Sequence, residues 1–89
     1  MNTSIFYEIE YTYYQYNSGA ADNGRYTKRI RTATPEEAAE TARKINLSAA
    51  GQLSDEADHE LRSRLIPWDG YFINAVACEV LEKREQLSL

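Results

Sequence analysis

The feature that most constrains this chain is an alternation of side chains between residues 5 and 16. The odd positions from 5 to 13 are apolar or aromatic, whereas the even positions carry the carboxylates and most other polar groups, which is typical of a β-strand with one buried face. The odd set is Ile5, Tyr7, Ile9, Tyr11 and Tyr13. The run also includes Tyr14 and Tyr16 among its even positions, so a strand would divide its tyrosines between two faces.

Residues 25–33 predict a second strand, which residues 17–24 join to the first through a loop that ends in Asn-Gly. We place Tyr16 opposite Arg25 in this hairpin and, further along, Glu10 opposite Arg31. The even residues of the first strand then share a face with the odd residues of the second. Opposite charges on neighbouring strands stabilise a sheet by ~0.2–1 kcal/mol per pair. The other face, with Tyr26 and Ile30, must be covered.

A helix is expected to begin after Thr34, because Thr34-Pro35-Glu36-Glu37 reads as an N-cap, a proline at the first helical position and a capping-box glutamate. Its inner face would consist of small residues, which let a helix lie close to bulky tyrosines. That face is Ala38, Ala39, Ala42 and Ile45.

A second helix is predicted from Ser54 to just before Pro67, with the charged pairs Asp58–Arg62 and Glu60–Arg64 one turn apart on its solvent side. Its buried stripe would consist of Ala57, Leu61 and Leu65.

Residues 72–84 fit either a strand or a helix. A helix would be capped by Asn74, whereas alternation would place Phe72, Val76, Cys78 and Val80 on one face of a strand. We favour the strand, because a two-stranded hairpin alone is marginal in water. The predicted fold class is α+β: a single domain over residues 1–89, in the order β-β-α-α-β, with an antiparallel sheet packed on two helices.

The composition limits the possible locations and chemistries. A single cysteine excludes an internal disulfide and a cysteine-rich zinc site. The N-terminal residues lack the basic and apolar regions of a signal peptide, and no apolar run approaches the ~20 residues needed to cross a bilayer. We therefore expect a cytoplasmic protein with no membrane association.

The catalytic and metal-binding alternatives have little support in the sequence. His59 and Cys78 could form a nucleophilic pair, but no local pattern brings them together. Asp55 and His59 could provide two metal ligands on one helix face, yet no third ligand is indicated. No glycine-rich phosphate loop is present. Converging carboxylates are the remaining enzymatic alternative, and the prediction is a non-enzyme without metal or cofactor.

A nucleic-acid-binding surface is the second functional hypothesis. Residues 25–31 contain Arg25, Lys28, Arg29 and Arg31, and aromatic residues beside a basic strand suit base stacking with phosphate contacts. The net charge of −4 and the carboxylates Glu8 and Glu10 on the same face oppose such binding. The acidic helices are a further alternative, as a surface that mimics nucleic acid.

Protein binding is the leading hypothesis. Tyrosine and arginine are enriched at binding hot spots, because each combines a large contact area with hydrogen-bonding groups. The predicted contact residues are Tyr14, Tyr16, Arg25, Arg29 and Trp68. A free strand edge would also permit a homodimer.

In type, the chain resembles the small α+β inhibitor proteins encoded by phages and other mobile elements, including anti-CRISPR proteins. The resemblance rests on small size, mild acidity, the tyrosine-rich hairpin and the helix TPEEAAETARK. It implies a stoichiometric inhibitor that blocks a surface of a host protein or nucleoprotein complex that processes nucleic acid.

Overall fold

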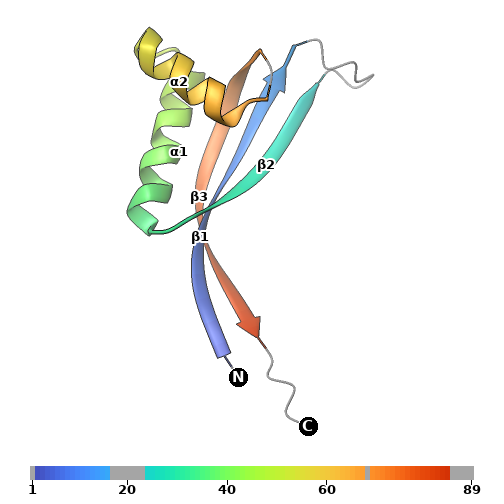
Figure 1. Ribbon diagram of the computed structural model, residues 1–89, viewed down its shortest axis with the longest axis vertical. Coiled ribbons are helices and arrows are strands. Elements are labelled where there is room, and N and C mark those ends of the chain that lie inside the picture. The colour runs from blue at the N-terminus through green and yellow to red at the C-terminus, as the bar shows by residue number, and fades with distance from the viewer. Residues whose placement is uncertain (1, 17–23, 68, 85–89) are drawn as a thin grey trace.

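The computed structural model of the protein describes residues 2–16, 24–67 and 69–84. Two helices lie along one face of a three-stranded antiparallel sheet, in the order β-β-α-α-β (Figure 1). The strands are β1 (Asn2–Gln15), β2 (Arg25–Thr32) and β3 (Gly70–Arg84), and the helices are α1 (Pro35–Ala49) and α2 (Asp55–Leu65). The predicted fold class and element order are confirmed, and the last segment is a strand.

Strand β1 is the centre of the sheet, between β2 and β3, and three of its odd residues belong to the core. Ile9, Tyr11 and Tyr13 are at most 2% exposed and belong to one cluster with Ala38 and Ala42 of α1. Ala39, which was also predicted on the inner face of this helix, is exposed. The Tyr11 hydroxyl donates a hydrogen bond of 2.8 Å to the carbonyl of Leu65, the last residue of α2. The alternation in the sequence therefore identified the buried face correctly for these three residues of β1, whereas Ile5 of the same predicted set is exposed.

The predicted register of the hairpin is wrong by two residues. Tyr14, rather than Tyr16, lies opposite Arg25. The Gln15 N–H donates to the Gly24 carbonyl at 2.9 Å, whereas the Tyr16 N–H donates to the Asp69 carbonyl at 2.8 Å, on the β3 side. Because the error is an even number of residues, every side chain keeps its predicted face.

A bulge in β3 changes which of its residues face the core, so the predicted face of that strand is wrong. The pairing with β1 shifts between Thr12 and Tyr13, so that Ile73 is an extra residue in β3. Phe72 is buried in the core, but after the bulge Ala75 takes the buried position and Val76 is 59% exposed. Phe72, Val76, Cys78 and Val80 therefore do not share one face, as alternation alone had predicted.

Both helices begin at the predicted caps. The Thr34 hydroxyl accepts a hydrogen bond from the Glu37 N–H at 3.1 Å, and the Ser54 hydroxyl accepts one from the Ala57 N–H at 3.3 Å. No helix in the described part of the chain is long and apolar enough to span a membrane.

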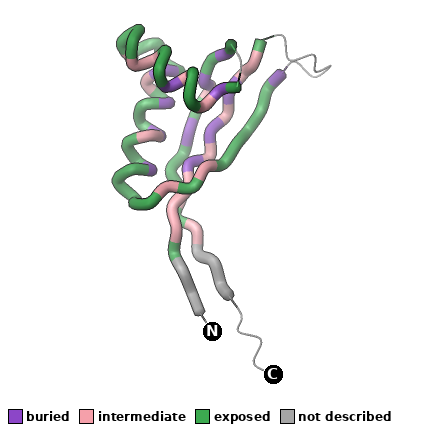
Figure 2. The backbone as a smooth tube through the Cα atoms, viewed as in Figure 1, coloured by how far each residue is buried: buried purple, intermediate pink, exposed green. Residues whose placement is uncertain are grey.

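Strands β1 and β3 continue beyond the end of β2 as a two-stranded ribbon, in which residues 2–6 pair with residues 80–84. The helices do not reach this ribbon, and the buried residues lie in the half of the sheet that the helices cover (Figure 2). Ile5, on the ribbon, is 54% exposed.

Candidate partner-binding surface

The face of the sheet opposite the helices is not covered by any helix or strand of the described chain (Figure 1). We call it the open face. The even residues of β1 lie along its centre, and the register places Arg25, Thr27, Arg29 and Arg31 of β2 beside them. Because the helices bury only the odd residues of β1, these even side chains are the ones available to a partner.

Three tyrosines meet at the end of the open face near the β1–β2 connection. The Tyr14 and Tyr71 rings are stacked, with centroids 5.4 Å apart and 19° between their planes. The Tyr16 ring lies 5.7 Å from Tyr14 and 5.8 Å from Tyr71. Although the rings contact one another, Tyr16 and Tyr71 remain 48% and 42% exposed. We call Tyr14, Tyr16 and Tyr71 the tyrosine cluster.

Gly70 allows β3 to begin close enough to β1 for this cluster to form. A Cβ atom at position 70 would lie 2.0 Å from the carbonyl oxygen of Tyr14, which is far inside van der Waals contact. Glycine has no Cβ atom, so the two backbones can approach at this point. Tyr71, the next residue, is thereby placed directly opposite Tyr14.

The two arginines predicted as contact residues have different environments. Arg25 is exposed and lies opposite Tyr14, at the edge of the tyrosine cluster. Arg29 donates from Nε to the carboxylate of Glu10 at 2.8 Å. Arg31 does not pair with Glu10 as predicted, and its guanidinium lies 3.7 Å from the centre of the Phe6 ring. Glu10 therefore offsets the charge of Arg29, while Arg25 is the arginine placed at the cluster.

Of the predicted contact residues, the structure brings Tyr14, Tyr16 and Arg25 together and places Arg29 further along the sheet. Trp68 lies outside the described residues. Sequence reasoning missed Tyr71 as a contact residue. The available signal was the Asp-Gly pair directly before Tyr71, which marks a turn and so places Tyr71 at the start of a strand. In an antiparallel pair, the start of that strand lies beside the end of the tyrosine-rich strand.

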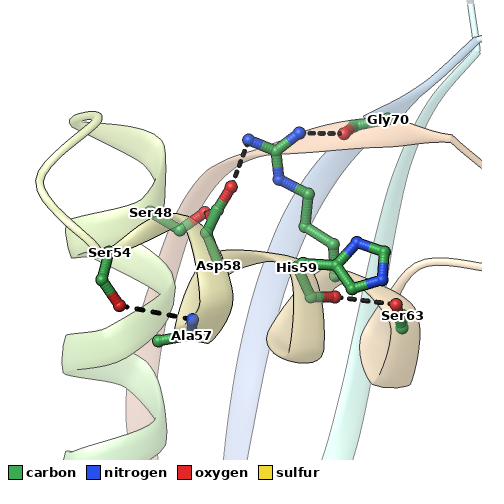
Figure 3. Close-up of polar contacts among 8 residues, drawn as sticks. Ser48, Ser54, Ala57, Asp58, His59, Ser63 and Gly70 are labelled. Atoms are coloured by element: carbon green, nitrogen blue, oxygen red, sulfur yellow. Dashed lines mark hydrogen bonds and ion pairs between the residues drawn. The ribbon is translucent and has the colours of Figure 1, made fainter.

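A hollow of about 590 Å³ lies beside the tyrosine cluster, between β3 and α2. Tyr16, His59, Arg62 and Gly70 are among its lining residues. Arg62 is held in place, since it pairs with Asp58 at 2.5 Å and donates to the Gly70 carbonyl at 3.1 Å (Figure 3). Asp58 in turn accepts from the Ser48 hydroxyl. The arginine thus connects α2 to the start of β3.

The hollow does not assemble a catalytic pair from its described residues. The Ser63 hydroxyl donates at 2.7 Å to the backbone carbonyl of His59, so the bond does not involve the imidazole (Figure 3). Cys78 lies on β3 opposite Glu8, and its thiol contacts the Val76 carbonyl at 3.8 Å. No group of three or more potential metal ligands occurs among the described residues.

The acidic surface of α1 includes an internal ion pair. Arg43 donates to Glu40 through two hydrogen bonds, of 2.6 and 3.0 Å. These bonds and the nearby positive charge lower the pKa of the Glu40 carboxyl.

Comparisons of the chain with models of protein families, with curated proteins and with solved structures return no match.

Proposed function

We propose that this chain is a non-catalytic binding protein that contacts a partner protein through the tyrosine cluster and Arg25. The observation that supports the proposal is the packing of Tyr14, Tyr16 and Tyr71 on the open face, where Tyr16 and Tyr71 stay about half exposed. Tyrosine is one of the residue types enriched at binding hot spots.

The contacts within the cluster favour binding over simple coverage of the sheet. Each ring is already held by its neighbours, so a partner would immobilise few additional side-chain rotamers. Tyrosine also loses little conformational entropy for the contact area that it provides.

The charges beside the cluster favour a protein partner over a nucleic acid. Arg29 is paired with Glu10, and Glu8 lies opposite Arg31. Phosphate recognition gains most from uncompensated positive charge, whereas protein interfaces commonly combine aromatic anchors with a mixed polar rim. Arg25 would then serve as one polar contact beside an aromatic centre.

The type of protein that the sequence resembles suggests a more specific role. In this proposal the partner is a host protein or nucleoprotein complex that processes nucleic acid in the cytoplasm. The chain would occupy one of its functional surfaces and inhibit it by steric or electrostatic blocking, without a cofactor or a chemical step.

The test is capture of partners from a host lysate by the tagged protein, with and without nuclease. The variant Tyr14→Ala/Tyr16→Ala/Arg25→Ala should lose a partner that the unaltered protein retains after nuclease treatment. A matched control, Lys44→Ala/Gln52→Ala/Glu56→Ala, changes three exposed residues on the helical side and should retain it. Equal capture by both folded variants would exclude the tyrosine cluster as the contact site.

Nucleic-acid binding is the second candidate, and the position of Arg25 beside stacked aromatic rings is the observation that favours it. Exposed rings next to a cation suit a single strand whose bases stack. A labelled single-stranded oligonucleotide titrated with the protein at increasing salt would distinguish the two candidates. Binding that weakens steeply with salt supports the nucleic acid, since phosphate contacts release counterions.

A further inference from the structure

The outer edge of β2 presents a row of backbone groups that bond nothing else in the described chain. The Gln15 N–H donates to the Gly24 carbonyl, and the pairing of β1 with β2 continues from there without a shift. Backbone groups of an antiparallel strand point inward and outward at alternate residues. The residues of β2 whose N–H and carbonyl point away from β1 are therefore Arg25, Thr27, Arg29 and Arg31. We call this row the free edge.

The other edge of the sheet, on β3, is partly occupied by side chains of the helices. The Asn46 side chain of α1 donates to the Ala75 carbonyl at 2.9 Å and accepts from the Ala75 N–H at 3.0 Å. Arg62 of α2 donates to the Gly70 carbonyl at 3.1 Å, at the start of the same strand. A strand that approached this part of β3 would have to displace these side chains, whereas no described side chain bonds the outward groups of β2.

The two faces of β2 offer different chemistry to a neighbouring strand. On the open face lie the exposed side chains of Arg25, Thr27, Arg29 and Arg31. On the helix side lie Tyr26 and Ile30, with Lys28 between them. Tyr26 is 36% exposed, and its ring stacks on the buried Tyr13 ring with the centroids 5.7 Å apart. A strand placed beside β2 would therefore meet cations on one face and mainly apolar surface on the other.

Most of the positive charge on the open-face side of β2 is not offset by a carboxylate. Arg29 is the only cation of β2 that forms an ion pair within the described chain, and its partner is Glu10. The Arg31 guanidinium lies 3.7 Å from the centre of the Phe6 ring, and Arg25 is exposed at the end of the strand. A second copy of β2 would bring these cations against one another, which destabilises strand pairing. The charges therefore favour an acidic strand as the neighbour.

We propose that the free edge binds an extended segment of a partner protein in which acidic side chains alternate with apolar ones. Added as an antiparallel fourth strand, the segment would bond the outward N–H and carbonyl groups of β2. Its acidic side chains would lie beside the arginines, and its apolar side chains beside Tyr26 and Ile30. The site includes Arg25 but none of the rings of the tyrosine cluster, so it does not depend on the contact proposed for those rings.

The outward backbone groups favour a peptide over a nucleic acid at this edge. Phosphate oxygens accept hydrogen bonds, so a nucleic acid would use the cations and the outward N–H groups but would leave the outward carbonyls without a donor from its phosphates. A peptide strand supplies a donor and an acceptor at the spacing of β2.

Fluorescence anisotropy with labelled synthetic peptides tests the proposal directly. A peptide about as long as β2, in which glutamate and valine alternate, should bind the unaltered protein. A peptide of the same composition, with its glutamates and valines in separate blocks, keeps the charge but loses the alternation, and a peptide with lysine in place of glutamate reverses the charge. Both controls should bind weaker by roughly tenfold or more, which corresponds to one or two lost backbone hydrogen bonds.

Methylation of the peptide backbone separates strand pairing from charge without changing the protein. Antiparallel pairing directs the N–H of each glutamate toward β2 and the N–H of each valine away from it. Methylation of the glutamate nitrogens should therefore abolish binding, whereas methylation of the valine nitrogens should preserve it.

Variants of the protein locate the site. Thr27→Pro removes an outward N–H and should weaken binding by roughly tenfold, with folding checked by circular dichroism. Three controls should bind as the unaltered protein does: Thr27→Ala removes only the side chain, Ala77→Pro places the proline on β3, and Tyr16→Ala alters the tyrosine cluster. Retained peptide binding by Tyr16→Ala distinguishes this site from the one under Proposed function.

Four results would overturn the proposal. They are equal binding of the alternating and blocked peptides, equal binding of the two methylated peptides, full binding by folded Thr27→Pro, and tighter binding of a single-stranded oligonucleotide than of the alternating peptide. The last result would assign the free edge to nucleic acid.

Discussion

Asn46 and Ala75 are joined by two hydrogen bonds, one to the carbonyl and one to the N–H of Ala75, although 29 positions separate them in the chain. An asparagine side chain has one donor and one acceptor group, and in this position it bonds β3 as a neighbouring strand would. Helix α1 therefore contributes a polar contact to the sheet as well as an apolar face. This contact fixes the helix along the edge strand.

Asn46→Ala should lower the free energy of unfolding by about 1–2 kcal/mol, because it removes both bonds and leaves the Ala75 backbone to water. Asn46→Asp should have a smaller effect, since its carboxylate still accepts from the N–H but cannot donate to the carbonyl. Urea unfolding followed by circular dichroism measures both changes. Gln52→Ala, an exposed substitution just after α1, is the control and should leave stability unchanged.

Gly70→Ala should destabilise the protein by about 1–3 kcal/mol, as expected for overpacking, since the new Cβ atom would meet the Tyr14 carbonyl. It should also displace Tyr71 and weaken partner binding. Gly51→Ala provides the contrast, because Gly51 has a φ of +72° and open space around its Cβ position. Its cost should come from backbone conformation alone, with partner binding unchanged. Equal effects of the two substitutions on binding would contradict the role given to Gly70.

Replacing the tyrosines of the first strand region by alanine should lower the free energy of unfolding strongly for a buried ring and weakly for an exposed one. Tyr13→Ala should cost about 3–5 kcal/mol, as for other buried aromatic residues, because Tyr13 is 2% exposed and stacks with Tyr26. Tyr16→Ala should change stability by less than about 1 kcal/mol, since Tyr16 is 48% exposed. Thermal unfolding of both variants checks the difference. A large loss for Tyr16→Ala would mean that the tyrosine cluster serves the fold.

The stability of the protein should fall at alkaline pH partly through Tyr11. Burial raises the pKa of the Tyr11 phenol above its ordinary value of 10.0, and the nearby Tyr13 raises it further. The folded state therefore holds this proton more tightly than the unfolded state, so its contribution is complete below pH 10 and is lost as the pH rises through the pKa of the folded protein.

Tyr11→Phe removes the titrating group and the hydrogen bond to Leu65, so the variant should be less stable near neutral pH by about 1 kcal/mol. Its stability should then decline less steeply at alkaline pH than that of the unaltered protein. Urea unfolding between pH 8 and pH 11 provides the measurement, with Tyr16→Phe as the exposed control. Parallel declines for Tyr11→Phe and the unaltered protein would refute the assignment.

Local patterns in the sequence were sufficient to predict the elements and the buried centre of β1. The alternation that contains Ile9 and Tyr11 identified the buried side of β1, and the caps at Thr34 and Ser54 located both helix starts. These features depend on residues that are close in the chain, where side-chain spacing and capping chemistry act directly.

The register and the complete tyrosine cluster depended on contacts that local patterns do not contain. The backbone N–H of Tyr16 bonds the carbonyl of Asp69, which directly precedes β3, and does not bond β2. Asp69 lies more than fifty residues later in the chain, so no local pattern could indicate this contact. Tyr71 joins Tyr14 only because Gly70 permits the close approach of β3. Alternation alone could not reveal that Ile73 is an extra residue. A bulge is defined by how a strand pairs with its neighbour, and the sequence of the strand itself does not contain that pairing.

The bulge at Ile73 also determines how the length of β3 can vary. It lets Tyr71 lie on the open face while Ala75, four residues later, lies in the core, although an unbroken strand would put both on the same side. Removing Ile73 would abolish the bulge, and the regular alternation that remains would still place Tyr71 on the open face and Ala75 in the core. Removing a second residue as well would turn one half of the strand over. Among related sequences, this segment should therefore either keep its length with the bulge or be one residue shorter without it.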